Sequence, residues 1–570
     1  MAGLATHIDP DELVKKLHDH PVHSHHAPRR SHINQVTPYS SRYAAKTELP
    51  KFKIPQASAP ADAVHQLIKD ELDLDGRPNL NLASFVGTYM EPQAEQLMIE
   101  NLSKNMSDAD EYPAMMDMHA RCISMLAHMW HVQPGETAIG TATTGSSEAI
   151  HLAGLAMKRR WHEARTRAGK DTLKPNILMG ANAQVALEKF ARYFDVEPRI
   201  LPVSRASRYR LDPALVQANI DENTIGIFVI LGSTYTGHYE PVAEIAALLD
   251  AHEQETGQSI DIHVDAASGG FIAPFTHAGA GPDTPWDFAL PRVKSINVSG
   301  HKFGLVYAGV GWIVWRDEHL LPRHLVFELH YLGGTEQSYT LNFSRPGAQV
   351  IAQYFNLVHL GVEGYRNVME NALANARLLS RALEATGWYE CVSDVHRRVG
   401  SFHLSPSPSS PDPESDSPSD SSDSSDSSAA YNPGLPVVAF TLSRALKASH
   451  PHMTQDSIST LLRAKQYIIP NYALPPHEDG TEILRVVVRE SMSLDLLHRL
   501  IADICEVTDR VMRMAPGDLA VFDKVGGGSG GGGGGRGPSV EKRFGNAGLG
   551  HEERDKARRP MGEGVHRSVC

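Results

Sequence analysis

The chain has 570 residues, 41% of them hydrophobic and 21% charged, with a formal net charge of −13. This length supports one large domain and a smaller one, and the acidic balance with no basic face argues against nucleic acid as a partner. No apolar run reaches the roughly 18 residues that a membrane-spanning helix needs, so we expect no membrane partner.

The N-terminal segment and the cysteines indicate the cellular compartment in which the protein is expected. Residues 1–20 are polar and carry acidic side chains, unlike a secretory or mitochondrial signal. Cys122, Cys391, Cys505 and Cys570 show no metal-binding spacing, and we expect reduced thiols in a cytoplasmic protein. Residues 1–60 are expected to be a flexible segment. Its run HDHPVHSHHAPRR offers imidazoles to a metal, but no second ligand cluster accompanies it, so no metal site is predicted.

From residue 61 onward the sequence becomes periodic. Amphipathic helices are predicted at 61–76, 93–106 and 115–131. Further helices are predicted at 147–168, 184–194 and 241–257, and strands at 176–180, 224–234, 259–267, 295–300 and 309–315. Helices that alternate with near-continuous apolar strands predict an α/β domain whose mostly parallel sheet is covered on both faces.

The C-terminal part is predicted to be a small α+β domain. Two long helices are expected at 346–360 and 366–387, followed by strands at 435–443 and 483–490. We place the N-terminal helices and large domain at 61–372 and the small domain at 373–520.

Two segments are expected to be disordered. The Ser/Asp insertion 405–428 within the small domain has acidic but no basic residues and too little apolar surface to order itself. The insertion is either a low-complexity loop without a function of its own or, as the alternative, a regulatory segment whose serines are phosphorylated. Residues 521–570 begin with a glycine-rich linker and form the expected tail.

Lys302 stands among small residues in the run SGHKFGL, at the end of a predicted strand. A partly desolvated lysine amine can attack a carbonyl group and form a Schiff base. The alternative is a lysine whose ammonium group reaches solvent.

Two more motifs accompany this lysine. Asp265 ends the strand SIDIHVD at a carboxyl edge, where α/β sheets bind ligands, and a pyridinium N–H would partner it; a structural or capping role is the alternative. Gly145, Ser146 and Ser147 precede a helix whose free N–H groups suit a phosphate monoester, although such turns commonly serve as caps. His301 could reach the same phosphate.

An aldehyde, a pyridine nitrogen and a phosphate are the three functional handles of pyridoxal 5′-phosphate (PLP), so the motifs together predict this cofactor. The runs HVDAASGGF, SGHKFGL, NFSRPGAQ, GSTYTGHYE and IGTATTGSSEA resemble glutamate decarboxylase of the bacterial, plant and fungal type, over roughly 79–515. The resemblance implies a fold-type I, PLP-dependent transferase-like large domain. It also implies a carboxy-lyase that converts L-glutamate to 4-aminobutanoate (GABA) and CO₂ through a Schiff base at Lys302.

The resemblance assigns a role to each matching residue. Lys302 and Asp265 are the implied catalytic residues. The implied cofactor-binding residues are Ser146, Ser147, Gln184, Thr234, Asp265, Ala267, His301, Lys302 and Ser344, the last from a neighbouring subunit. Arg485 is implied to bind the substrate α-carboxylate, and Tyr331 to lie in a mobile loop that closes the site. Ser84, Phe85 and Asp108 are implied to read the distal carboxylate.

The family also implies a homo-oligomer, either a dimer or a larger assembly such as a hexamer. The tail lacks the spaced apolar anchors of a helix-in-groove target, so we expect no calmodulin binding. One alternative is a PLP decarboxylase for an aromatic or β-acidic amino acid, against which Gln184 and Asp108 argue. The other is a catalytically silent scaffold, against which the intact Lys302, Asp265 and Arg485 argue.

Overall fold

The computed structural model describes residues 52–276, 285–329, 336–401 and 428–515. The chain divides into two compact units, 1–77 and 78–570. In the first unit the described part contains the expected amphipathic helix, α2 (Ala61–Leu72). Tyr331, nearly all of the Ser/Asp insertion, the tail and the N-terminal segment up to residue 51 lie outside the described residues.

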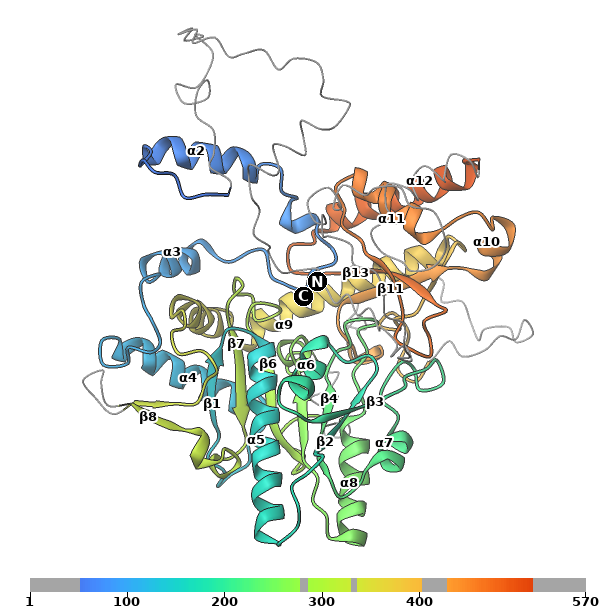
Figure 1. Ribbon diagram of the computed structural model, residues 1–570. Helices are drawn as coiled ribbons and strands as arrows, with labels where there is room; N and C mark the ends of the chain where they lie inside the picture. The colour runs from blue at the N-terminus through green and yellow to red at the C-terminus, as the bar shows by residue number, and fades with distance from the viewer. Residues whose placement is uncertain (1–51, 277–284, 330–335, 402–427, 516–570) are drawn as a thin grey trace, which may run out of the picture. The chain divides into compact units, whose positions relative to one another are not determined.

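A seven-stranded sheet forms the centre of the second unit, with the strand order β1-β7-β6-β5-β4-β2-β3 (Figure 1). Only β7 is antiparallel to its neighbours, which confirms the mostly parallel sheet. The strands are β1 (Ile139–Thr143), β2 (Asn176–Gly180), β3 (Glu197–Leu201), β4 (Thr224–Ile230), β5 (Ile262–Asp265), β6 (Val293–Ser299) and β7 (Gly311–Trp315). The six strands other than β7 therefore end at one edge of the sheet.

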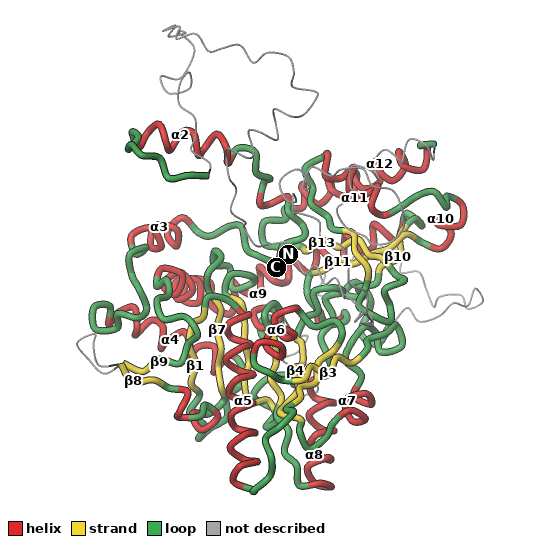
Figure 2. Tube along the Cα trace, viewed as in Figure 1, coloured by secondary structure: helices red, strands yellow, loops and turns green. Residues whose placement is uncertain are grey.

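Helices cover both faces of this sheet (Figure 2). The alternation of side chains along β4 shows how: Ile227 and Val229 belong to the core under α4, α8 and α9, whereas Phe228 and Ile230 belong to the core under α5 and α6. These helices are α4 (Pro113–Met129), α5 (Ser146–Arg167), α6 (Val185–Tyr193), α8 (Val242–Thr256) and α9 (Ala348–Ala385).

Shorter elements complete the large domain. The helix expected at 93–106 is α3 (Pro92–Glu100); it stops earlier because Asn101 leaves the helical conformation, and turns follow. The others are α7 (Pro213–Asn219), β8 (Phe327–Leu329) and β9 (Glu336–Ser338). Among the described helices, none combines the length and the apolar character that crossing a membrane requires.

The small domain is an antiparallel sheet with the order β10-β11-β13-β12, packed on helices. Alternate residues of β11 and β13, such as Phe440 and Leu484, pack with Leu497 and Leu500 of the last helix. The elements are β10 (Tyr389–Cys391), β11 (Val437–Leu442), α10 (Arg444–Ser449), α11 (Gln455–Ala464), β12 (Asn471–Ala473), β13 (Glu482–Val487) and α12 (Leu494–Arg513).

Helix α9 belongs to both cores. Gly361 interrupts it with φ 57° and ψ −166°, between the two helices that the sequence predicted. Beyond this break α9 contributes Tyr365, Met369 and Leu373 to the large core and then Ala376, Leu379 and Leu383 to the small core.

Candidate active site

A row of buried polar side chains lies on one face of β5 and β6. The parallel register places His263 beside Ser295 and Asp265 beside Asn297, and Ser299 follows two residues later. All five residues are 3% exposed or less. Because side chains alternate along a strand, these five share the face that α5 covers and end at its carboxyl edge. Polar groups in a sheet interior must be paired or used by a ligand.

Asp265 is the only carboxylate of this row. Its Oδ1 accepts hydrogen bonds from Asn297 Nδ2 at 3.0 Å and from the backbone N–H of Ala267 at 3.1 Å. Burial raises the pKa of Asp265, while these two donors and the nearby Lys302 charge oppose that rise. The arrangement supports a carboxylate that still lacks a strong cationic partner, which a pyridinium N–H would provide.

His263 fixes the orientation of Asn297. Its Nε2 lies 2.7 Å from Asn297 Oδ1, and its Nδ1 lies 2.8 Å from Ser295 Oγ. Burial lowers the pKa of His263 to about 4, so the ring is neutral at pH 7. The Asn297 amide donates to Asp265 through Nδ2, so its oxygen accepts from His263 and the ring proton is on Nε2. His263 therefore fixes the Asn297 amide, which donates a hydrogen bond to Asp265.

Lys302 lies in the turn that follows β6 and is 8% exposed. Its Nζ donates to Ser268 Oγ at 3.4 Å and lies 5.4 Å from the centroid of the Phe85 ring. Its charge also opposes the rise in the pKa of Asp265 that burial causes, so the amine and the carboxylate belong to one site. The buried cation and anion that the sequence pointed to are therefore brought together.

The start of α5 supplies the third part of the site. Ser146 Oγ lies 2.7 Å from Ser299 Oγ at the end of β6. The turn is packed closely: a Cβ on Gly311 would lie 2.5 Å from the carbonyl carbon of Gly145, so only glycine fits there. A Cβ on Gly145 would lie 3.2 Å from the His301 ring, which places that ring beside the free N–H groups of the helix.

His301 itself tests the fit of a phosphate. Its Nδ1 is buried and has no hydrogen-bond partner among the described residues. Burial, followed by the charge of Lys302, lowers the pKa of His301 to about 4. A neutral imidazole N–H next to a helix N-terminus suits a phosphate oxygen. Ser146, His301, Asp265 and Lys302 thus fit the phosphate, the ring nitrogen and the aldehyde of PLP.

Arg485 approaches the same site from β13 of the small domain. Its Nη1 donates to the carbonyl oxygen of Thr234 at 2.7 Å, and its Nη2 donates to that of Ala83. The guanidinium carbon lies 5.0 Å from the Phe85 centroid and 5.7 Å from that of Tyr472. Its Nε is buried and has no hydrogen-bond partner in the described part of the chain. A rigid arginine with an unused buried donor is suited to a carboxylate.

Three other expected cofactor residues lie at the ends of elements of the large domain. Gln184 precedes α6, where its Oε1 accepts from the N–H of Ala186 at 2.6 Å. Ala267 follows β5 and donates to Asp265. Ser147 is the exposed second residue of α5. These roles stay predictions, because no ligand reports on them.

Asp108 and Ser344 belong to a separate cluster around Asn105. Asn105 Nδ2 donates to Ser344 Oγ at 3.3 Å, and the N–H of Asp108 donates to the carbonyl oxygen of Asn105 at 3.2 Å. Among the described residues no contact joins this cluster to Lys302. Ser84 lies next to Phe85, and its Oγ accepts from the N–H of Val86 at 3.2 Å.

The sequence motifs missed the residues behind Asp265. A period-two pattern was present in the run SINVS, where polar and apolar residues alternate in a strand buried on both faces. Such alternation is also typical of a strand with one face in water, so it would identify Ser295, Asn297 and Ser299 only once the strand is placed at the centre of a covered sheet. Tyr472 and Ser268 had no comparable sequence pattern.

The fold and the site together define a PLP-dependent decarboxylase of fold type I. The pyridoxal-dependent decarboxylase conserved domain matches residues 55–405, more than half of the chain. The chain belongs to this family and, within it, to the glutamate decarboxylases, which confirms the resemblance drawn from the motifs.

Relatives from three groups of organisms support this placement. A glutamate decarboxylase of Saccharomyces cerevisiae is 49% identical over 81% of this chain and 79% of its own length. One of Solanum lycopersicum is 46% identical over 84% and 86%. The solved glutamate decarboxylase of Lactobacillus brevis superposes with a TM-score of 0.72 at 35% identity, covering 82% of this chain and 97% of that one.

Proposed function

We propose that the protein decarboxylates L-glutamate to GABA and CO₂ with the residue roles that follow. The observation that supports these roles is the convergence of Lys302 and Arg485 on Phe85, at 5.4 Å and 5.0 Å from its ring. An amine that can hold the cofactor aldehyde and a guanidinium that can hold a carboxylate thus lie near the same buried aromatic ring.

Each residue of the site has a definable task. PLP, when bound, supplies an electron sink for the bond between Cα and the α-carboxylate. Lys302 would hold the cofactor through its aldehyde, and Asp265 would keep the ring nitrogen protonated. Arg485 binds and orients the α-carboxylate with a guanidinium that two backbone carbonyls already fix. Phe85, 1% exposed, keeps water away from both cationic groups, which strengthens their electrostatic interactions.

We propose a homo-oligomer in which the neighbouring subunit completes the site. Asp108 and Ser344 share one cluster that has no described contact with Lys302 of the same chain. A second copy that brings this cluster to the site would add one residue toward the substrate's distal carboxylate and one toward the phosphate. We also propose a cytoplasmic location, supported by Cys122 and Cys391, which are free and buried.

Product analysis of the PLP-loaded protein tests the activity. We expect CO₂ and GABA in equal amounts from L-glutamate, and little CO₂ from aspartate or aromatic amino acids. Lys302→Ala should abolish turnover and the borohydride-reducible visible band. Faster release from an aromatic substrate would contradict the proposal, and a normal cofactor band without turnover on any amino acid would favour the silent scaffold.

A mixing experiment tests the composite site. Lys302→Ala and Asp108→Asn, each inactive alone, should regain activity when co-expressed as a mixed oligomer, because one of the two sites in a pair then has both native residues. Activity that stays at the level of the separate variants would contradict a site shared between subunits.

A further inference from the structure

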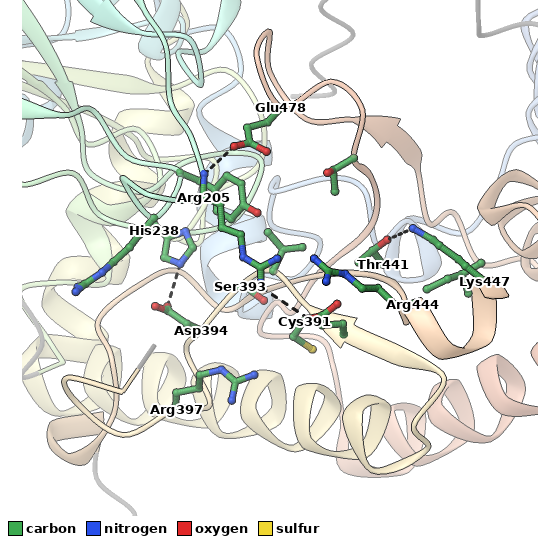
Figure 3. A pocket seen from close by; sticks show the side chains of 16 residues that line it. Arg205, His238, Cys391, Ser393, Asp394, Arg397, Thr441, Arg444, Lys447 and Glu478 are labelled. Carbon is green, nitrogen blue, oxygen red and sulfur yellow. Dashed lines mark hydrogen bonds and ion pairs between the residues drawn. The ribbon is translucent and has the colours of Figure 1, made fainter. Parts of the chain in front are cut away.

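A cavity of about 220 Å³ lies away from Lys302, between the large and the small domain (Figure 3). We call it the seam pocket. Its Lys and Arg side chains come from both sides: Arg205 and Arg208 from the large domain, and Arg397, Arg444 and Lys447 from the small domain. None of the residues assigned to the decarboxylase site lines it.

Positive charge exceeds negative charge in the seam pocket. Five Lys and Arg side chains line it against three carboxylates. Two of these acids have partners of their own: Asp394 lies 3.1 Å from His238 Nε2, and Glu478 accepts the backbone N–H of Arg205 at 2.8 Å. The third, Glu390, lies 3.9 Å from the Arg205 guanidinium. A small anion is therefore favoured over a cation or a neutral ligand.

Two arginines from opposite domains face one another across the seam pocket. Figure 3 shows Arg205 and Arg444 extended toward each other above Ser393. Arg444 is exposed and makes no ion pair or hydrogen bond among the described residues, whereas Arg397 is held by Glu384 at 2.7 Å. Two positive side chains that line one cavity from opposite sides favour an anion between them.

We propose that the seam pocket binds a small phosphorylated compound whose phosphate dianion lies between Arg205 and Arg444. A tetrahedral dianion can accept hydrogen bonds from guanidinium groups that arrive from different directions, and each guanidinium can donate two parallel bonds. Lys447, which donates to Thr441 Oγ1 at 3.2 Å, adds a third cation on the small-domain side. The bound phosphate thereby joins the two domains.

Contacts lead from the seam pocket to Arg485. Tyr209 lines the pocket and packs in a cluster that also holds Tyr235 and Tyr472. The rings of Tyr235 and Tyr472 lie 5.6 Å apart, and Tyr472 lies against the Arg485 guanidinium. A ligand that joins the domains at this seam should hold Arg485 in place and lower KM for glutamate. This second step rests on the proposed function, whereas binding itself does not.

Calorimetry with inorganic phosphate as the probe tests binding on the PLP-loaded enzyme without substrate. The visible cofactor band, recorded in parallel, shows whether the cofactor's own phosphate site is disturbed. We expect saturable binding with an unchanged band. Arg444→Gln and Lys447→Gln should each weaken it by roughly fivefold, the effect of one exposed ion pair. Both residues are exposed, so the variants should fold.

Arg510→Gln is the matched control, because Arg510 is an exposed arginine on α12 of the same domain and does not line the seam pocket. It should bind phosphate as the unmodified enzyme does. Equal binding by all variants, or none by the unmodified enzyme, would overturn the proposal. Glutarate is the second probe: if it binds more tightly than phosphate and depends on Arg444, the phosphate assignment is wrong. Phosphate that binds at the seam without changing KM would overturn only the coupling to Arg485.

Discussion

Arg485→Lys separates the charge of this residue from its geometry. The native guanidinium donates to the carbonyl oxygens of Thr234 and Ala83 and keeps a buried Nε for a ligand. Lysine retains the positive charge but cannot reach two carbonyls and a carboxylate from one planar group. A hydrogen bond to a charged group contributes about 1.5–3 kcal/mol. We therefore expect kcat/KM for glutamate to fall by about 10- to 100-fold.

A neighbouring arginine provides the control. Arg489 is also 3% exposed and follows Arg485 on the same segment, where it donates to the carbonyl oxygens of Val86 and Asn81. Arg489→Lys should lower the thermal midpoint as Arg485→Lys does, since both leave buried carbonyls without a donor. Only Arg485→Lys should also weaken substrate use.

Steady-state kinetics and the cofactor spectrum decide between these outcomes. The visible band should be unchanged in both variants, because neither residue lies among the groups assigned to the cofactor. If Arg485→Lys keeps kcat/KM within twofold of the native value, or if Arg489→Lys loses as much as Arg485→Lys, Arg485 does not bind the α-carboxylate.

Three further variants probe the site and the core. Asn297→Leu removes the side-chain donor to Asp265, which helps to keep that carboxylate charged. Because bound PLP needs the charged carboxylate, its affinity should fall about tenfold in a fluorescence titration, and an unchanged affinity would refute this. Burial, followed by the charge of Arg345, lowers the pKa of His119 to about 4. The unfolded chain therefore binds a proton at higher pH than the folded protein does, and the free energy of unfolding falls as the pH drops from about 6.5 toward 4. His119→Gln should flatten that fall in urea unfolding at pH 7 and pH 5, and parallel curves would contradict it. Gly154→Ala places a Cβ 2.5 Å from an aromatic ring and should lower the thermal midpoint, whereas Gly480→Ala, with open space, should not; equal midpoints would show that the core accommodates the methyl group.

The central strands could be predicted from the sequence and the edge strands could not. The runs at 176–180, 224–234 and 259–267 are apolar because both faces of a central strand are buried. The two strands of the seven-stranded sheet that were missed, β1 and β3, are its outer strands, and the short β8, β9, β10 and β12 were missed as well. β3 has the sequence EPRIL with four of five residues at least partly exposed, so it shows no apolar run.

The sequence predicted the residues expected to contact the cofactor directly, but not the residues that hold them in place. Asp265 and Lys302 could be placed together because each ends or follows a strand at the same edge of a parallel sheet. His263 and Asn297 could not, since their role depends on the register of β5 against β6, which a single sequence does not specify. Arg485 lies on a strand of another domain and was found only through the family resemblance.

Helix α9 sets a limit on how the site can open. The stretch after Gly361 packs first into the large core and, within one further turn beyond Leu373, into the small core at Ala376. A continuous helix resists twisting, so the small sheet cannot rotate freely about this axis or separate from the large one without unpacking either core. Any opening of the site for substrate entry must therefore leave the contacts of α9 with both cores in place.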